Sequence, residues 1–148
     1  LRARMITLAP RVELHGRLGQ ADLAGLMRRG AVLVLPSFYE GLPLVLAEAR
    51  ACGCRLVSTA LPGVVRTLAP AFGDALTLVP LPRLIGPDTP EPSDLSHFTD
   101  ALATALAGAV AAGPTAPDAA ELAPFTWQAV FARVERAWLK AAAPASPA

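Results

Sequence analysis

The sequence predicts a parallel, doubly wound α/β fold. Three observations support this prediction: strand-like apolar runs alternate with helix-like segments, the turns between them are short, and residues 31–37 are apolar at nearly every position. Continuous apolar runs are typical of parallel strands that helices cover on both faces. Alternation of strands and helices favours parallel pairing through helical crossovers. With 148 residues, the chain fits one ordinary domain.

Glycine and proline mark the ends of the expected elements. Gly16 closes the first strand, Gly30 stops the first helix, and Pro43 lies in the first turn of the second helix. Residues 81–94 are rich in proline and acids and predict a surface loop. In chain order we expect strand 11–16, helix 20–30, strand 31–37, helix 42–53, strand 55–59, a short helix at 64–69, strand 75–80, helix 95–113 and helix 125–140.

The last expected helix carries a stripe of large apolar side chains at helical spacing: Trp127, Val130, Phe131, Val134 and Trp138. Such a stripe predicts packing against the core rather than a platform on which nucleic-acid bases stack. Residues 1–141 are therefore expected to form the domain. Residues 142–148, which contain mostly alanine and proline, predict a disordered tail.

Charge and hydropathy argue against two classes of partner. The chain has 13 Lys and Arg, 12 Asp and Glu, and a net charge of +1, so we expect no binding of nucleic acid or capture by acidic membranes. The one basic pair, Arg28 and Arg29, falls at a helix end, where cations interact favourably with the helix dipole. No apolar run approaches the ~20 residues that cross a bilayer, so no transmembrane segment is expected.

The cysteines indicate a reducing location. Cys52 and Cys54 are one residue apart, which is poor spacing for a redox pair, and no second cluster completes a zinc site. They are expected to be small buried thiols beside a strand, in the cytoplasm. The chain begins with Leu1 rather than Met and no signal peptide precedes the fold, so we expect it to be the tail of something longer.

Two acids, Glu40 and Glu48, interrupt the most hydrophobic region of the chain. In doubly wound sheets, ligands bind at the carboxyl ends of strands beside helix N-termini, and the loop 37–43 is expected at that edge. A phosphate could be held there by backbone amides alone, those of Gly41, Leu42, Leu44 and Val45, whereas Pro43 has no N–H to donate.

The same two acids have chemical and structural interpretations. Glu48 could accept hydrogen bonds from the hydroxyls of a ribose, and Glu40 could reach another part of the same ligand. The two could face one crevice from different depths. Considered separately, Glu40 could be an acid that the positive end of the helix dipole stabilises, and Glu48 could be a solvent-facing residue.

Residues 34–59, VLPSFYEGLPLVLAEARACGCRLVST, carry a family resemblance. They resemble the signature region of the retaining glycosyltransferases of family four, in which Pro-Ser at a strand end leads to Glu-Gly-Leu-Pro, a second Glu and Ala-x-Ala-Cys-Gly. Weaker similarity extends to residues 12–18 and 125–138. The resemblance implies a GT-B enzyme, of which this chain is the Rossmann-like carboxyl-terminal lobe without its first strands and without the amino-terminal lobe.

The resemblance implies transfer of a sugar from a nucleotide sugar to an acceptor, with retention of anomeric configuration and without a metal or other cofactor. Glu40 would be catalytic, beside the donor sugar and its leaving phosphate. The donor-binding residues would be Glu48 at the ribose, Gly16 near the nucleobase, and Gly41, Leu42, Pro43, Leu44 and Val45 at the pyrophosphate. The acceptor, whether glycan, lipid or small molecule, stays open, as does a peripheral position at the inner face of the membrane.

Three departures from the family pattern affect these expectations. The amino-terminal acceptor lobe is absent. The opening strands of this lobe, where relatives carry an Arg and a Lys on the donor phosphates, are absent too, and Arg17 is a poor substitute by position. Arg66 stands where many relatives carry Glu. Apart from these departures, His15 has no partner acid in sequence reach. We therefore expect the isolated chain to be inactive. Two alternatives stay open: a nucleotide-sugar-binding module without catalysis of its own, and another GT-B-like enzyme such as an epimerase or phosphorylase.

Overall fold

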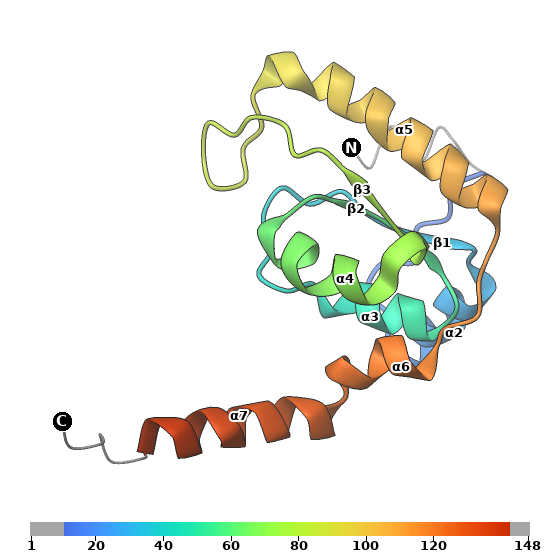
Figure 1. The fold of residues 1–148 in the computed structure, drawn as a ribbon. Coiled ribbons are helices and arrows are strands. Elements are labelled where there is room, and N and C mark those ends of the chain that lie inside the picture. The colour runs from blue at the N-terminus through green and yellow to red at the C-terminus, as the bar shows by residue number, and fades with distance from the viewer. Residues whose placement is uncertain (1–10, 143–148) are drawn as a thin grey trace.

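The computed structural model describes residues 11–142 as a small parallel α/β unit followed by a helical arm (Figure 1). In chain order its elements are α2 (Gln20–Arg29), β1 (Val32–Leu35), α3 (Leu44–Ala51), β2 (Arg55–Thr59), η1 (Val64–Leu68), α4 (Ala69–Phe72), η2 (Gly73–Ala75), β3 (Leu76–Val79), η3 (Pro92–Asp94), α5 (Leu95–Ala112), α6 (Ala119–Leu122), η4 (Ala123–Phe125) and α7 (Trp127–Ala142). The expected disordered tail, 142–148, lies almost entirely outside the described residues.

The sheet has three strands in the order β1-β2-β3, and both pairings are parallel. Val57 in the central strand lies opposite Val34 on one side and Thr77 on the other. The predicted parallel α/β class is therefore confirmed. Parallel pairing requires crossover connections, and α3 and the helical turns η1 and α4 supply them.

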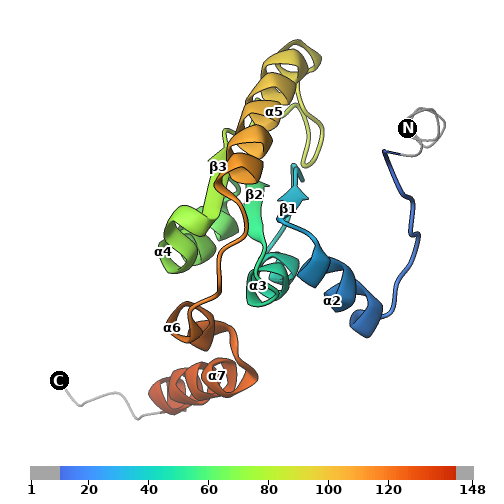
Figure 2. The same cartoon turned by 90° about the vertical axis from the view of Figure 1, so that its right-hand side faces the viewer.

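Helices cover both faces of this sheet. Figures 1 and 2 show α5 across one face and α2, α3 and α4 on the other. Because side chains alternate along a strand, neighbouring β2 residues enter different cores: Leu56 packs on the α3 side and Val57 on the α5 side. The core under α5 also includes the ring pair Phe38 and Phe98, with centroids 5.2 Å apart.

The strand expected at residues 11–16 is not present. These residues have no regular secondary structure, and no described strand pairs with them. A strand-like sequence alone does not make a strand, because its N–H and C=O groups need a neighbouring ladder. Glu13 and Leu14 are accordingly exposed. Four strands were predicted, and this one is wrong.

The loops that follow the three strands gather at one edge of the sheet, on the left in Figure 1. They comprise residues 36–43, 60–63 and 80–94. The last was predicted as an irregular surface loop, yet it is partly ordered: Leu84 and Pro90 form an isolated antiparallel bridge, and Arg83 pairs with Asp94 across its base. We call this side the carboxyl edge and the opposite side the amino edge.

By length and composition alone, one helical stretch, Pro92–Ala112, could cross a membrane. Core helices pass the same test, so this is weak evidence. In the structure α5 packs on all three strands through a face that includes Phe98 and Ala109. Its small outward residues leave much of the helix accessible.

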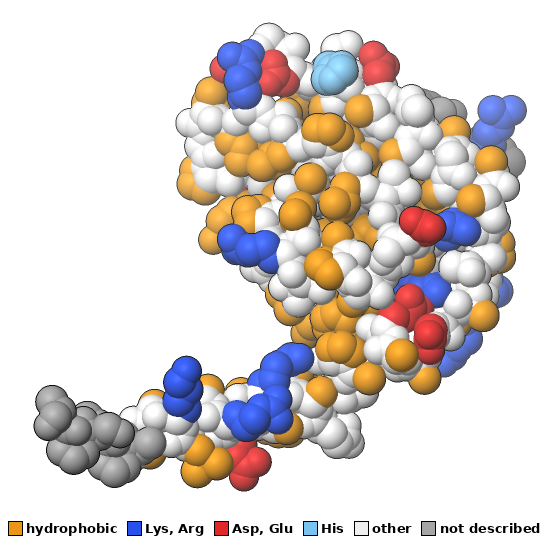
Figure 3. Space-filling view, in the orientation of Figure 1, with side chains coloured by type: hydrophobic (Ala, Val, Ile, Leu, Met, Phe, Trp, Pro, Cys, Tyr) orange, Lys and Arg blue, Asp and Glu red, His pale blue; other side chains and the backbone are white. Residues whose placement is uncertain are grey.

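The helical arm contradicts the prediction for the last helix. None of the sixteen residues of α7 is buried. Four of the five stripe residues expected in the core are exposed instead, with Trp127 and Trp138 the most exposed, and Val130 is half-buried. Figure 3 shows α7 projecting from the body with apolar and basic side chains both at its surface. The reason is that α7 contacts chiefly η4, so no second layer covers its apolar face.

Candidate functional site

The first turn of α3 opens onto the carboxyl edge. Pro43 precedes the helix with φ of −75° and is buried, which fixes where the helix begins. No side chain caps this end. Within residues 11–142, no backbone acceptor is found for four nearby N–H groups, those of Gly41, Leu42, Leu44 and Val45. Free amides at the positive end of a helix dipole are suited to bind an anion.

Glu40 lies on the loop just before this turn. Its side chain is exposed, and the Ser37 hydroxyl donates a hydrogen bond of 3.0 Å to Glu40 Oε1. The bond holds the carboxylate at the carboxyl edge instead of leaving it to swing freely. Glu40 thus directly precedes Gly41 and Leu42, two of the residues whose N–H groups are free.

A close backbone contact joins this loop to the next one. A Cβ atom on Gly63 would collide with the carbonyl oxygen of Gly41, so the two loops approach as closely as glycine allows. Gly63 directly precedes η1, a widened π-helical turn that continues into α4. The starts of two helices thus lie side by side at the carboxyl edge.

Glu48 lies one turn into α3, on its exposed side. It lines a groove of ≈ 220 Å³ between α2 and α3, together with Gln20, Leu23, Ala24, Met27, Ala51 and Cys52. Glu40 is not part of this groove. Glu40 lies on the loop that precedes α3 and Glu48 lies within the helix, so Glu48 lines this groove without Glu40.

Sequence comparison supplies the identity that this geometry suggests. Residues 1–82 match the family model described as glycosyl transferases group 1, which is more than half of the chain. The chain belongs to the group 1 glycosyltransferases. One curated relative, the D-inositol 3-phosphate glycosyltransferase of Arthrobacter sp. (strain FB24), is 39% identical over 54 residues. Those residues are 36% of this chain and only 13% of that relative.

Residues 34–59, which carry the resemblance noted in the sequence, fold into the end of β1, the loop at the carboxyl edge, α3 and β2. Gly16 lies outside this arrangement. Its φ of +65° is a left-handed conformation that favours glycine, but it has no neighbour that a side chain would meet. The structure does not bring Gly16 to either acid, and a role near a nucleobase stays a prediction.

Two smaller expectations concern His15 and the two cysteines. His15 was expected to lack an acidic partner, but its Nε2 lies 3.4 Å from Glu13 Oε2. Glu13 is only two residues from His15 in the chain, and the sequence argument overlooked it. Cys54 is a buried free thiol, as predicted, and burial raises its pKa above the ordinary value. Cys52 is only half-buried.

Sequence reasoning missed a buried arginine near the other end of α3. Arg50 is 3% exposed, its guanidinium donates to the carbonyl oxygens of Thr115 and Ala116 at 2.7 Å each, and Nη2 lies 2.7 Å from Glu121 Oε1. Glu121 also closes a capping box at the start of α6 with Asp118. This network attaches the segment after α5 to α3 at the amino edge. Its members are about 70 residues apart along the chain, so no local pattern could reveal it.

No metal site is evident in residues 11–142, because no group of three or more His, Cys, Asp or Glu side chains could hold an ion there. The groups available at the carboxyl edge are backbone amides, the carboxylate of Glu40 and the guanidinium of Arg66. Such a set can bind an anion and orient a polar ligand.

Proposed function

We propose that this chain binds the nucleotide-sugar donor of a retaining, metal-independent glycosyltransferase. The observation that carries the proposal is the uncapped N-terminus of α3 at the carboxyl edge, with four free amides next to Glu40, in a chain of the group 1 family. Because a diphosphate is an anion, this position suits it better than any neutral ligand.

The proposed donor extends along α3. The amides of Gly41, Leu42, Leu44 and Val45 hold the pyrophosphate, and Glu40 lies beside the sugar. Glu48 accepts hydrogen bonds from the ribose hydroxyls, with the ribose entering the α2–α3 groove. Its carboxylate is well suited to this role because a vicinal diol offers two donors.

In the reaction, the bond between the anomeric carbon and the diphosphate oxygen breaks and a bond to the acceptor oxygen forms. The acceptor hydroxyl gives its proton to the departing diphosphate, and the products are a glycoside and a nucleoside diphosphate. Charge grows on the departing diphosphate, and free amides directed at it lower the barrier. The second half of the cleft, which holds the acceptor, belongs in this proposal to an amino-terminal lobe, so the 148-residue chain alone is inactive. The free thiols fit a cytoplasmic protein.

A calorimetric titration with UDP, GDP and ADP tests the donor assignment. For the nucleotide that binds best, Glu48→Ala should weaken binding by about 10-fold or more, because a charged hydrogen-bond acceptor for the ribose is lost. The 2′,3′-dideoxy analogue should bind both proteins equally. Glu135→Ala, which removes an exposed acid from α7, is the matched control and should change neither affinity.

Glu40→Ala, measured in the protein extended by an acceptor lobe, should reduce turnover far more than nucleotide affinity. Equal losses for the ribose and dideoxy ligands in Glu48→Ala would remove the ribose contact. Absence of binding by all three diphosphates would overturn the donor-binding function. Turnover by the 148-residue chain alone would contradict its proposed inactivity, and nucleotide-sugar binding without turnover in the extended protein would favour a binding module.

A further inference from the structure

The loops that follow β1, β2 and β3, together with η1, carry an unbalanced set of charges. Residues 36–43, 60–68 and 80–94 contain four acids and only two arginines, Arg66 and Arg83. A diphosphate bound in this region therefore meets net negative charge unless a cation lies close to it. Such a ligand therefore needs an arginine at the carboxyl edge whose charge is not already paired with an acid.

Arg83 is already occupied. Its Nη2 lies 2.9 Å from Asp94 Oδ1, while its Nε and its backbone N–H both donate to Asp94 Oδ2. Hydrogen bonds from Arg83 lower the pKa of the Asp94 carboxyl to about 2, so this partner stays ionised at any ordinary pH. The charge of Arg83 is compensated within its own loop.

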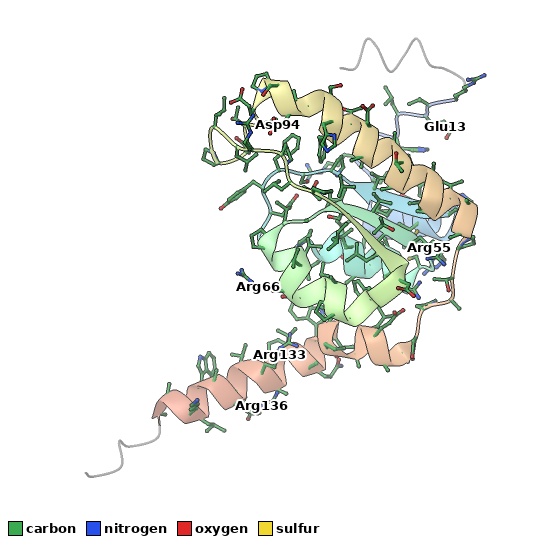
Figure 4. The ribbon with its side chains drawn as sticks, turned by 45° about the horizontal axis from the view of Figure 1, so that its top comes forward. Glu13, Arg55, Arg66, Asp94, Arg133 and Arg136 are labelled. Atoms are coloured by element: carbon green, nitrogen blue, oxygen red, sulfur yellow. The ribbon has the colours of Figure 1, made fainter. Side chains whose placement is uncertain are left out.

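Arg66 differs in this respect. It is exposed, and in the described part of the chain its guanidinium takes part in no hydrogen bond and no ion pair. Figure 4 shows it at the end of the molecule where the loops after the strands gather, on the opposite side from Arg55. Among the two arginines of the carboxyl edge, Arg66 is the one without a partner.

The position of Arg66 on η1 is fixed by its neighbours. Val64 and Leu68 are fully buried and anchor the turn to the core. Gly63 contacts the backbone at Gly41, next to the free amides of α3. Arg66 follows Gly63 by three residues, less than one turn of the π-helical η1, so it belongs to the end of η1 that meets the loop at Gly41.

We propose that Arg66 binds the phosphates of the nucleotide-sugar donor, opposite the amides at the start of α3. This inference rests on the proposed function. A guanidinium presents a planar fork of N–H donors that matches two phosphate oxygens at once. Arg66 thereby offsets the negative charge that Glu40 brings to the same edge, and amides and guanidinium hold the diphosphate between two loops.

The test uses ligands that differ only in phosphate: the nucleoside diphosphate that binds best among UDP, GDP and ADP, its monophosphate and its nucleoside. Arg66→Gln should weaken diphosphate binding by about 10- to 100-fold. Affinity for the monophosphate should fall less, and affinity for the nucleoside should not change. The diphosphate affinity of Arg66→Lys should lie between those of the unaltered chain and Arg66→Gln, because an ammonium retains the charge but lacks the planar fork of donors.

Arg29→Gln is the matched control. It removes the same charge from an exposed site at the end of α2, beside the amino edge, and should leave all affinities unchanged. Raising salt from about 50 to about 200 mM should weaken diphosphate binding more in the unaltered chain than in Arg66→Gln, because screening acts on the exposed guanidinium.

The outcomes separate the two proposals. If the unaltered chain binds a diphosphate and Arg66→Gln binds it equally well, the Arg66 inference is wrong and the donor site stands. If Arg66→Gln loses the nucleoside as much as the diphosphate, with unchanged circular dichroism, Arg66 does not act on the phosphates. If the unaltered chain binds none of the diphosphates, the proposed function fails and this inference fails with it.

Discussion

The sequences of α3 and α7 both predict a helix with an apolar face, but neighbouring elements cover that face only in α3. Each was expected to be a helix that packs an apolar face into the core. Half of the eight residues of α3 are buried, while none of the sixteen of α7 is. The difference teaches that periodicity identifies which residues share a face of a helix, whereas the elements that lie opposite decide whether that face is covered.

The contacts of the two helices explain the difference. α3 packs on β1, β2 and α2, so its apolar side chains meet two layers. α7 is attached mainly to η4, and one of its few anchors is a hydrogen bond of 2.8 Å from Arg133 to the carbonyl oxygen of Pro124. Its aromatic side chains meet mostly each other, as in the stacked pair Trp127 and Phe131.

The largest effect is expected for Leu46→Ala in α3. Leu46 is fully buried, and its loss leaves a cavity between α3 and the sheet, so the free energy of unfolding should fall by about 2–5 kcal/mol. Urea denaturation followed by circular dichroism measures it. Leu139→Ala, the same change at an exposed position of α7, should cost less than about 0.5 kcal/mol. Equal losses for the two leucines would contradict the comparison.

An intermediate effect is expected for Arg50→Met, which cuts the link between α3 and the segment that leads to α7. Glu121 would lose its cation and two carbonyl groups their donor. Glu121 retains 14% of its side-chain exposure, so water can partly compensate, and we expect a loss of about 1–3 kcal/mol. Hydrogen exchange should accelerate most at residues 113–122.

Arg136→Met on α7 is the control for this change. It removes an exposed guanidinium that makes no ion pair within the described residues, so neither stability nor hydrogen exchange should alter measurably. If Arg50→Met left exchange at residues 113–122 unchanged, the buried network would not be what holds α6 to the body of the molecule.

Local signals predicted much of the body and little of the long-range structure. β2 has the bounds that the sequence predicts, Arg55–Thr59, because Gly53 ends the preceding helix and an apolar run follows. The helix predicted at 42–53 is also present, but Pro43, expected in its first turn, directly precedes the first helical residue, Leu44. The segment 11–16 has a strand pattern too, but pairing requires a neighbour that sequence periodicity does not specify.

The candidate site follows the same division. The free amides and Glu40 depend on one loop and one helix start, so the motif in the sequence is enough to place them together. The groove at Glu48 depends on how α2 packs against α3, and the position of Arg66 depends on the contact between Gly63 and Gly41. These contacts join residues about 20 or more positions apart, which a local pattern cannot show.

The smallest effect is expected for Trp138→Ser on α7. The indole is 73% exposed, so its loss should change the free energy of unfolding by less than about 0.5 kcal/mol, measured by the same urea denaturation. Phe72→Ser, which replaces a core aromatic residue that is 3% exposed, is the positive control and should cost several times more. If Trp138→Ser destabilised the chain as much as Leu46→Ala, the aromatic stripe would be covered in solution. Both helices would then bury their apolar faces. They would differ only in which surface covers them.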